Sequence, residues 1–398
     1  MSQTQASELF SSASFVDRDS APDPGSVARG DPDTPLRVLA GALRAPTEAE
    51  ASERLDHRLV RPSPVPRVKT DVLSDVLRAV RLTGAVYFDF ELSSPWVAEA
   101  PPSRAIADRV MPGAQRVIEY HLIARGSCWG HVVGEPPIRL REGDLIVFPR
   151  GEAHVLSSGP GMRAAPDMSA FARPSTPLPL FYELGGGGPY RARIVCCFLG
   201  CDERPYNPLL AALPGVIHLS ATGPRATTAW LRTLMHIAVR ESCSARPGSE
   251  NVLARLSELM FVETIRRYLE TLSPAETGWL AGLRDPVVGQ ALAALHSATN
   301  APWTVDRLAR LVGVSRSVFA ERFAGMVGHP PMQYLALWRM QLASRLLADG
   351  GPVAAVASAV GYESEAAFGR AFKKLVGQAP ATWRRGAIGR TRSEVGPD

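Results

Sequence analysis

Basic side chains close to the C-terminus carry the most specific chemistry in this sequence. Arg370 is followed by Lys373 and Lys374, and Arg316 precedes them in the chain. A guanidinium group can form two parallel hydrogen bonds with O6 and N7 of a guanine, whereas an ammonium group binds a phosphate without reading the sequence. We therefore expect this part of the chain to bind duplex DNA, with Arg370 as a base reader and the other three as phosphate contacts.

The segment that contains these side chains repeats itself. The first half of the pattern recurs after 48 residues and the second half after 49. The first copy consists of Val305, Leu308, Ala309, Val312, Gly313, Phe319, Phe323, Gly328, Pro331 and Tyr334. The second copy consists of Val353, Val356, Ala357, Val360, Gly361, Phe368, Phe372, Gly377, Pro380 and Trp383. The one-residue slip falls between the inner glycine and the first phenylalanine, so we predict two copies of one unit that differ only in a turn.

Each copy predicts a helix-turn-helix. Gly313 and Gly361 supply the turn, because glycine adopts left-handed backbone conformations without strain. Ser315 and Ser364 follow as N-caps of a second helix, in which two phenylalanines four residues apart face the core. That helix would enter the major groove. Its outer face gives the expected DNA-binding residues: Arg316, Ser317, Ala320, Glu321 and Arg322 in the first copy, and Glu365, Ala366, Ala367, Gly369, Arg370, Lys373 and Lys374 in the second.

A connecting helix is predicted between the two units, over Met332–Ala348, with Leu335, Trp338, Leu342 and Leu346 on its apolar side. At ~1.5 Å per residue it would span roughly 25 Å and hold the two units near one DNA turn apart. Positive charge is concentrated in the same region. Between Val287 and Ala387 eleven lysines and arginines stand against five acids, although the net charge of the 398-residue chain is only +5. This asymmetry indicates a polyanionic partner. A helical bundle whose phenylalanines only fill a core is the alternative, but the repetition and the charge favour DNA.

This C-terminal region resembles the AraC/XylS regulators over roughly residues 289–386. The resemblance rests most of all on Val360-Gly361-Tyr362-x-Ser364-x3-Phe368-x-Arg370-x-Phe372-Lys373-x3-Gly377-x2-Pro380-x2-Trp383-Arg384. It implies a bacterial regulator with a ligand-sensing or dimerising N-terminal domain. Two positions depart from the family pattern: Trp383 replaces a tyrosine, and Glu321 stands where a basic or amide side chain is common. The second departure affects the base preference of the first unit.

The N-terminal half has a different pattern. Short β-type runs separated by turn residues cover Ala85–Phe90, Val117–Ala124, Asp144–Phe148 and Arg191–Leu199, which favours a sandwich or barrel. The proline- and glycine-rich stretch Phe171–Tyr190 predicts a long loop. Helices are predicted over Thr227–Glu241 and Asn251–Leu272, where their apolar stripes would form a dimer interface or cover the barrel.

This half resembles the cupin domains that are fused to such regulators. Gly143-x5-Pro149-x-Gly151-x2-His154 fits the second cupin motif, and Glu119-x6-Gly126 fits the end of the first. The resemblance implies a jelly-roll β-barrel with a central pocket, so Glu119, His121 and His154 are the candidate ligand-binding residues. The His-x-His pair that metal-dependent cupins place before the glutamate is missing, and two ligands do not make a stable metal site. His121 and His131 could substitute, but they are more typical of a barrel core. We therefore expect no metal, no other cofactor and no catalytic residue.

Five cysteines at irregular spacing do not form a disulfide framework and suit a reducing cytosol. The cluster Cys196-Cys197-x3-Cys201 raises the alternative of thiol or metal sensing, with Cys197 and Cys201 as the sensing residues. On a strand, however, Cys196 and Cys197 point to opposite faces, and isolated cysteines on apolar strands are usually small core residues.

These patterns predict an α+β multidomain protein with an N-terminal cupin-like β-barrel and a C-terminal all-α double helix-turn-helix domain. We expect a disordered arm over 1–70, a sensor and dimerisation domain over 71–272, a linker over 273–286, the DNA-binding domain over 287–387 and a tail over 388–398. No apolar run is long enough for a membrane span and no secretory signal is visible. The expected place of action is therefore the cytoplasm, in association with the nucleoid.

The predicted function is that of a sequence-specific transcriptional regulator that is not an enzyme. Its expected partners are double-stranded promoter DNA, a small-molecule effector or redox signal in the barrel, a second copy of the chain and, if it activates, RNA polymerase. One alternative is a metal-dependent cupin enzyme with a DNA-binding tail, which near-stoichiometric metal in purified protein would favour. The other is an architectural DNA binder, whose DNA affinity no effector would change.

Overall fold

The structure is a computed structural model that describes residues 71–80, 82–171, 178–201, 205–222, 229–244, 246–273 and 276–386, with the backbone alone at positions 86 and 87. The chain divides into two units, Met1–Val68 and Lys69–Asp398, and every described residue lies in the second. The arm predicted over 1–70 and the tail predicted over 388–398 lie outside the described residues.

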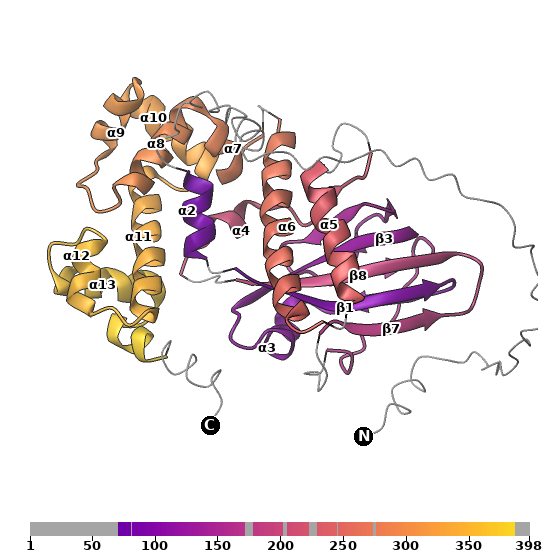
Figure 1. Cartoon of the computed structure of the whole chain (residues 1–398). Coiled ribbons are helices and arrows are strands. Elements are labelled where there is room, and N and C mark those ends of the chain that lie inside the picture. The colour runs from indigo at the N-terminus through magenta and orange to yellow at the C-terminus, as the bar shows by residue number, and fades with distance from the viewer. Residues whose placement is uncertain are drawn as a thin grey trace, which may run out of the picture. The chain divides into compact units, whose positions relative to one another are not determined.

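The described strands form one nine-stranded mixed sheet that curls into a half-barrel (Figure 1). The central path runs in the order β2-β6-β3-β8-β1-β7, with β4 and β5 paired to β3 and with β9 paired to β5. All pairs are antiparallel except β1 with β7. The strands are β1 (Thr83–Ser93), β2 (Val97–Ala100), β3 (Arg116–Val132), β4 (Ile138–Arg141), β5 (Leu145–Phe148), β6 (His154–Ser157), β7 (Leu180–Gly185), β8 (Arg191–Cys201) and β9 (Ile217–Leu219).

Strand β3 connects the two halves of this sheet. Its first part pairs with β5 and β8, and its second part, from Ser127 onward, pairs with β4 and β6. The apolar run Val117–Ala124 predicted only the first part, because small and polar residues dominate the second. The stretch predicted as a loop over Phe171–Tyr190 contains β7, which pairs in parallel with β1.

Two long helices, α5 (Ala229–Ser242) and α6 (Ser249–Thr271), lie side by side across one face of the sheet (Figure 1). They correspond to the two helices predicted there. Strand β1 passes close under α6: a Cβ added at Gly84 would lie 2.4 Å from the carbonyl oxygen of Ala254. The hydroxyl of Tyr120 in β3 donates a hydrogen bond to the backbone oxygen of Ser257, at 2.9 Å. The helix is thus fixed to the strands by both packing and a buried hydrogen bond.

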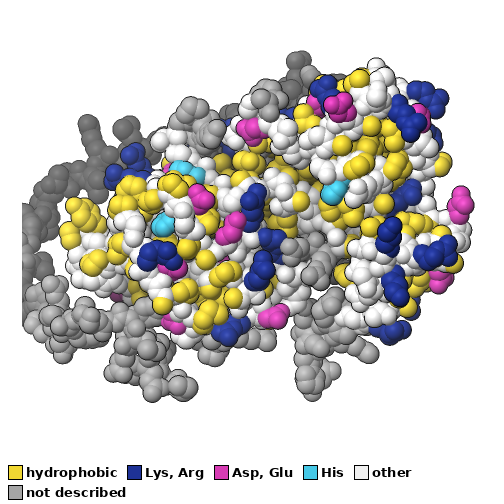
Figure 2. Space-filling view, turned by 180° about the vertical axis from the view of Figure 1, so that it is seen from behind, with side chains coloured by type: hydrophobic (Ala, Val, Ile, Leu, Met, Phe, Trp, Pro, Cys, Tyr) yellow, Lys and Arg dark blue, Asp and Glu magenta, His cyan; other side chains and the backbone are white. Residues whose placement is uncertain are grey.

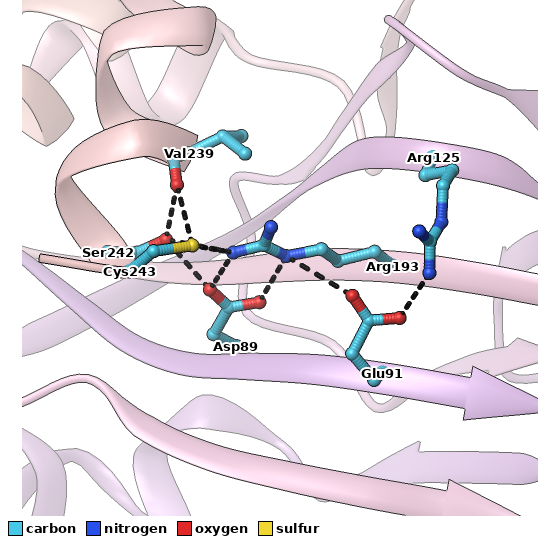
Figure 3. Close-up of polar contacts among 7 residues, drawn as sticks. All are labelled: Asp89, Glu91, Arg125, Arg193, Val239, Ser242 and Cys243. Atoms are coloured by element: carbon cyan, nitrogen blue, oxygen red, sulfur yellow. Dashed lines mark hydrogen bonds and ion pairs between the residues drawn. The ribbon is translucent and has the colours of Figure 1, made fainter. Parts of the chain in front are cut away.

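A buried ion pair fixes α5 to the sheet (Figure 3). The carboxylate of Asp89 in β1 accepts two hydrogen bonds from Arg193 in β8, at 2.9 and 2.6 Å, and a third from the hydroxyl of Ser242 at 2.7 Å. Glu91 lies 3.7 Å from the same guanidinium group and accepts a hydrogen bond from Arg125 at 2.6 Å. The hydrogen bonds from Arg193 to Asp89 outweigh its partial desolvation and raise the pKa of the guanidinium further above its usual value.

The C-terminal region is helical and contains α7 (Trp279–Arg284), α8 (Pro286–Ser297), α9 (Val305–Val312), α10 (Arg316–Val327), α11 (Pro331–Ala348), α12 (Val353–Ala359) and α13 (Glu365–Val376). A further helical stretch covers residues 380–386 at the end of the described chain. Helix α11 is the predicted connecting helix, extended by one residue at its start. Part of the segment predicted as a linker forms α7, whose Trp279 is buried and donates a hydrogen bond to the hydroxyl of Tyr334, at 3.0 Å.

The first helix-turn-helix shares its hydrophobic core with the N-terminal half of the described chain, residues 71–272, which we call the sensor half after its expected role. The second helix-turn-helix has a core of its own. Phe319, Phe323 and Trp338 belong to the same cluster of buried residues as α2 (Val72–Ala79), α4 (Pro208–Ala212) and the covering helices α5 and α6. Met340, Phe368 and Phe372 belong to a separate cluster. The two helix-turn-helix units therefore differ in what they are packed against.

A buried glutamine of α11 joins two segments from the sensor half. The side-chain amide of Gln341 donates to the carbonyl oxygen of Ala79 at the end of α2, at 3.1 Å, and accepts from the backbone amide of Tyr206, also at 3.1 Å. Nearby, His296 of α8 lies 3.7 Å from the carboxylate of Asp75 in α2. The short elements η1 (Ser103–Ala105) and α3 (Ala107–Val110) complete the described secondary structure of the sensor half.

Candidate DNA-binding surface and barrel interior

The first helix-turn-helix consists of α9 and α10. Helix α9 has its C-cap at Gly313, whose φ of 73° is the left-handed conformation that favours glycine. The hydroxyl of Ser315 then accepts a hydrogen bond from the backbone amide of Val318 and caps the start of α10. The C-cap of α10 is Gly328, which is again left-handed. Phe319 and Phe323 are buried, with ring centroids 5.6 Å apart. The caps and the phenylalanine pair lie where the sequence pattern predicted them.

The second helix-turn-helix consists of α12 and α13 and repeats this geometry. Ser364 accepts a hydrogen bond from the backbone amide of Ala367, and the C-cap of α13 is the left-handed Gly377. The ring centroids of Phe368 and Phe372 lie 5.4 Å apart, and both side chains are buried. The extra residue of this copy lies in the turn, where α12 has its C-cap at Val360 before the left-handed glycine at 361. A Cβ at that glycine would lie 2.7 Å from the Cα of Asn300, so the turn also needs glycine for space.

The residues predicted to contact DNA lie on the outer faces of α10 and α13 or at their edges. Ala320, Ala367 and Gly369 are half-buried, and the other nine are exposed: Arg316, Ser317, Glu321, Arg322, Glu365, Ala366, Arg370, Lys373 and Lys374. Figure 2 shows lysine and arginine side chains gathered over the C-terminal helices with few acids among them. Arg370, Lys373 and Lys374 make no ion pair with another described residue, so their charges are available to a partner.

Two arginines of the first unit are already engaged. Arg322 donates two hydrogen bonds to a carboxylate oxygen of Asp285, at 3.1 and 2.6 Å, and Arg316 lies 3.6 Å from the carboxylate of Asp306. Asp285 also caps α8, because its other oxygen accepts from the backbone amides of Val287 and Val288. Burial would raise the pKa of Asp285, but the hydrogen bonds from Arg322 and the two amides outweigh it, and this pKa lies below its usual value.

Asp285 was not among the residues predicted for this surface, although an aspartate directly before a proline at a helix start is a recognisable capping signal. Its second role, toward Arg322, depends on a contact between residues 37 apart in the sequence, which no local pattern encodes. Asp285 thus links Arg322 of α10 to the N-terminus of α8.

The barrel interior brings Glu119, His121 and His154 together, as the cupin resemblance implied. The Nε2 atoms of His121 and His154 lie 2.9 Å apart, and a carboxylate oxygen of Glu119 lies 3.8 Å from Nε2 of His154. Nδ1 of His121 contacts the sulfur of Cys196 at 2.9 Å, and Nδ1 of His154 donates to the backbone oxygen of Glu152 at 3.2 Å. Phe148, which sequence analysis did not select, stacks on His154 with ring centroids 3.9 Å apart.

Burial keeps this group of side chains uncharged near neutral pH. It raises the pKa of Glu119 to about 8 and lowers the pKa of His154 to about 4. The pKa of His121 is likewise far below its usual value, because of burial and the neighbouring imidazole. One carboxyl oxygen of Glu119 is buried without a hydrogen-bond partner. Among the described residues, no set of three or more His, Cys, Asp or Glu side chains is arranged to hold a metal ion.

His131, the other histidine considered, lies elsewhere on β3, and its Nδ1 is buried without a partner.

Cys196 belongs to the core inside the barrel, whereas Cys197 and Cys201 belong to the core beneath the helices. Neighbouring cysteines thus point to opposite faces, as predicted for a strand. All three thiols are buried, and burial raises the pKa of Cys197 to about 12. A protonated, inaccessible thiol is typical of a structural cysteine.

Comparison with known proteins covers both halves of the chain. A family model described as a cupin matches residues 71–270, and one described as a helix-turn-helix domain matches residues 308–386. An AraC-like transcription regulator of Streptomyces lividans is 35% identical over 282 residues, which cover 68% of this chain and 88% of that protein. A similar regulator of Streptomyces antibioticus is 34% identical, over 68% of this chain and 88% of its own length.

The HTH-type transcriptional regulator AlkR of Acinetobacter baylyi is 30% identical over 289 residues, which cover 67% of this chain and 90% of that protein. No described helix is long and apolar enough to cross a membrane.

Proposed function

Since the chain belongs to the family of AraC-like transcription regulators, we propose that it regulates promoters by placing α10 and α13 in successive major grooves. It is a sequence-specific DNA-binding regulator. The observation that carries the proposal is the duplicated unit: two capped helices with the same buried phenylalanine pair, each exposing its outer face, joined by the 18-residue α11. That helix is roughly 27 Å long, which suits two readers on one face of a duplex.

The outer faces of the two recognition helices support different roles for their residues. Arg370 has a free guanidinium group and is the proposed guanine reader. Lys373, Lys374 and Arg316 are the proposed phosphate contacts. Small residues leave room for close approach to the bases: Ala320 in α10, and Ala366, Ala367 and Gly369 in α13. In the proposed complex Ser317 and Glu321 face the groove. Glu365 lies in the first turn of α13. Arg322 is held by Asp285, so we assign it to the orientation of α10.

We place the sensor domain over 71–272, the connecting segment over 273–286 and the DNA-binding domain over 287–387. The proposed effector site is the barrel interior around Glu119, His121 and His154, where an uncharged polar group with one unpartnered carboxyl oxygen lies among aromatic side chains. Its role is to bind a small molecule, with no catalytic step. The relatives are named as transcription regulators and not as enzymes.

A homodimer is proposed through the outer faces of α5 and α6. Trp230 and Ile237 are exposed seven residues apart on α5, and Val252 and Leu259 are exposed at the same spacing on α6. Exposed apolar stripes on adjacent helices are typical of association surfaces, and a dimer suits repeated half-sites in DNA. RNA polymerase is the further partner if the protein activates. The proposed place of action is the bacterial cytoplasm, where promoter DNA lies in the nucleoid.

Binding of the full chain to its own upstream region and to random duplexes tests the proposal. Arg370→Ala should weaken operator binding by about 1–3 kcal/mol and relax the preference at one base pair. Lys373→Ala should weaken operator and random DNA alike and reduce the slope of log affinity against log salt concentration by about 1. Fluorescence anisotropy titrations over a range of salt concentrations measure both effects. If both variants lose the same affinity for operator and random DNA, the assignment of roles is wrong.

A further inference from the structure

The two recognition helices carry opposite charges at the same structural position. Glu321 and Arg370 are 49 residues apart. The same offset relates Phe319 to Phe368 and Phe323 to Phe372, which form the equivalent buried pairs of α10 and α13. The repeat therefore places a carboxylate in the first unit where the second unit has its candidate guanine reader.

This shared position faces away from the core. Successive residues of an α-helix are about 100° apart, so Glu321 lies roughly opposite the buried Phe319 and Phe323, and it is exposed. Arg370 lies in the same way opposite Phe368 and Phe372. Both side chains project from the second turn of a capped recognition helix, the part that reaches base edges when such a helix enters a major groove.

The carboxylate of Glu321 is not neutralised within the described part of the protein. Glu321 makes no hydrogen bond or ion pair with any described residue, and the adjacent Arg322 is bonded to Asp285. Arg316, one turn earlier, lies beside Asp306. A free carboxylate close to phosphates is repelled, so in a major groove it would bind favourably only where a base edge donates a hydrogen bond to it.

Cytosine is the base that fits an acceptor without a donor. Its major-groove edge presents the N4 amino group and no acceptor, whereas guanine presents two acceptors, thymine presents O4, and adenine places N7 beside its amino group. We propose that Glu321 selects a cytosine in the half of the operator read by α10, as the counterpart of the guanine read by Arg370. This inference rests on the proposed function, because it assumes that α10 enters a major groove.

The test is selection of bound sequences from a double-stranded oligonucleotide library with a randomised core, using the full-length protein. Wild type is compared with Glu321→Gln, Glu321→Ala and Glu321→Arg. Glu363→Gln serves as the control, because it removes the same charge from an exposed turn outside both recognition helices. Circular dichroism spectra and melting temperatures confirm that each variant is folded.

Wild type and the control should select a C at one position, with roughly tenfold or greater discrimination against other bases. Glu321→Gln and Glu321→Ala should lose that preference alone, and Glu321→Arg should change it to G. If every variant selects the same bases as wild type, or if the variants gain affinity for all sequences without a change at any position, the inference is overturned. A wild-type protein that selects no sequence would instead overturn the proposed function, and the inference with it.

Discussion

Inside the barrel, Glu119 and His154 have pKa values shifted in opposite directions by the same cause. Burial penalises the charged form of each, so the acid becomes weaker and the base becomes weaker as well. At neutral pH both are uncharged, so a molecule bound in the interior would meet neutral hydrogen-bonding groups. This makes the proposed effector site suited to molecules with a hydrogen-bonding group rather than to ions.

These shifts predict how stability depends on pH. The folded pKa of Glu119, about 8, is above its usual 4.5, so its contribution to stability is fully present below pH 4.5 and is lost as pH rises through 8. The contribution of His154, with a folded pKa of about 4 against 6.5, increases between pH 4 and 6.5 and is constant above. Between pH 6.5 and 8, Glu119 alone should therefore lower the free energy of unfolding by about 1.4 kcal/mol per pH unit.

Urea unfolding at pH 6.5, 7.2 and 8.0 measures this slope. Glu119→Gln keeps the size of the side chain but cannot ionise, so its free energy of unfolding should change less with pH than that of wild type. Parallel pH dependences for the two proteins would contradict the shifted pKa of Glu119.

At the scale of elements, the turns of the second unit depend on glycines of two kinds. Gly361 and Gly377 are both left-handed, with φ of 85° and 89°. An added Cβ at Gly377 meets nothing within 4 Å, whereas at Gly361 it would lie 2.7 Å from the Cα of Asn300 and 2.8 Å from its carbonyl oxygen. The first glycine is needed for space as well as conformation, and the second for conformation alone.

Alanine substitution separates these two requirements. Gly377→Ala should lower the free energy of unfolding by about 1–2 kcal/mol, the usual cost of a left-handed alanine. Gly361→Ala should lower the free energy of unfolding by the same amount and by roughly 1–3 kcal/mol more, because the added Cβ overlaps Asn300. Thermal or denaturant unfolding of both variants gives the comparison, and equal losses would show that the contact with Asn300 relaxes without cost.

The repeated pattern was sufficient to predict both helix-turn-helix units, because their glycines, capping serines and phenylalanine pairs act locally. The candidate residues of the barrel followed from motif spacing. Helix α7 could not be predicted in the same way, since six residues without a side-chain cap are stabilised by tertiary burial of Trp279 rather than by a local signal. The contacts of Asp285 with Arg322 and of Asp89 with Arg193 join residues far apart in sequence, so they too appear only in the fold.

At the scale of the whole molecule, the two helix-turn-helix units are supported unequally. The first shares a core with α7 and with helices of the sensor half, and the second is packed around its own cluster. Removal of the sensor half should therefore affect the first unit more than the second.

Fragments 276–386 and 285–386 test the contribution of α7 to the first unit, because they differ only by the segment that contains α7 and both keep Asp285 with its bonds to α8 and Arg322. The shorter fragment loses the buried Trp279 and its hydrogen bond to Tyr334. It should be less stable by roughly 3 kcal/mol or more, as for other losses of a buried tryptophan side chain. Denaturant unfolding followed by circular dichroism compares them; equal stabilities would mean that α7 is dispensable for the first unit.

Gln341 links the connecting helix α11 to two segments of the sensor half. Its side chain holds Ala79 with one atom and Tyr206 with another, and it lies on the helix that separates the two recognition helices. A displacement of either segment in the sensor half would therefore move the spacer rather than any base-reading side chain. A signal from the sensor half would then change mainly the spacing and rotation between the two half-sites that the recognition helices read. Inserting or deleting base pairs between these half-sites would imitate or oppose that signal.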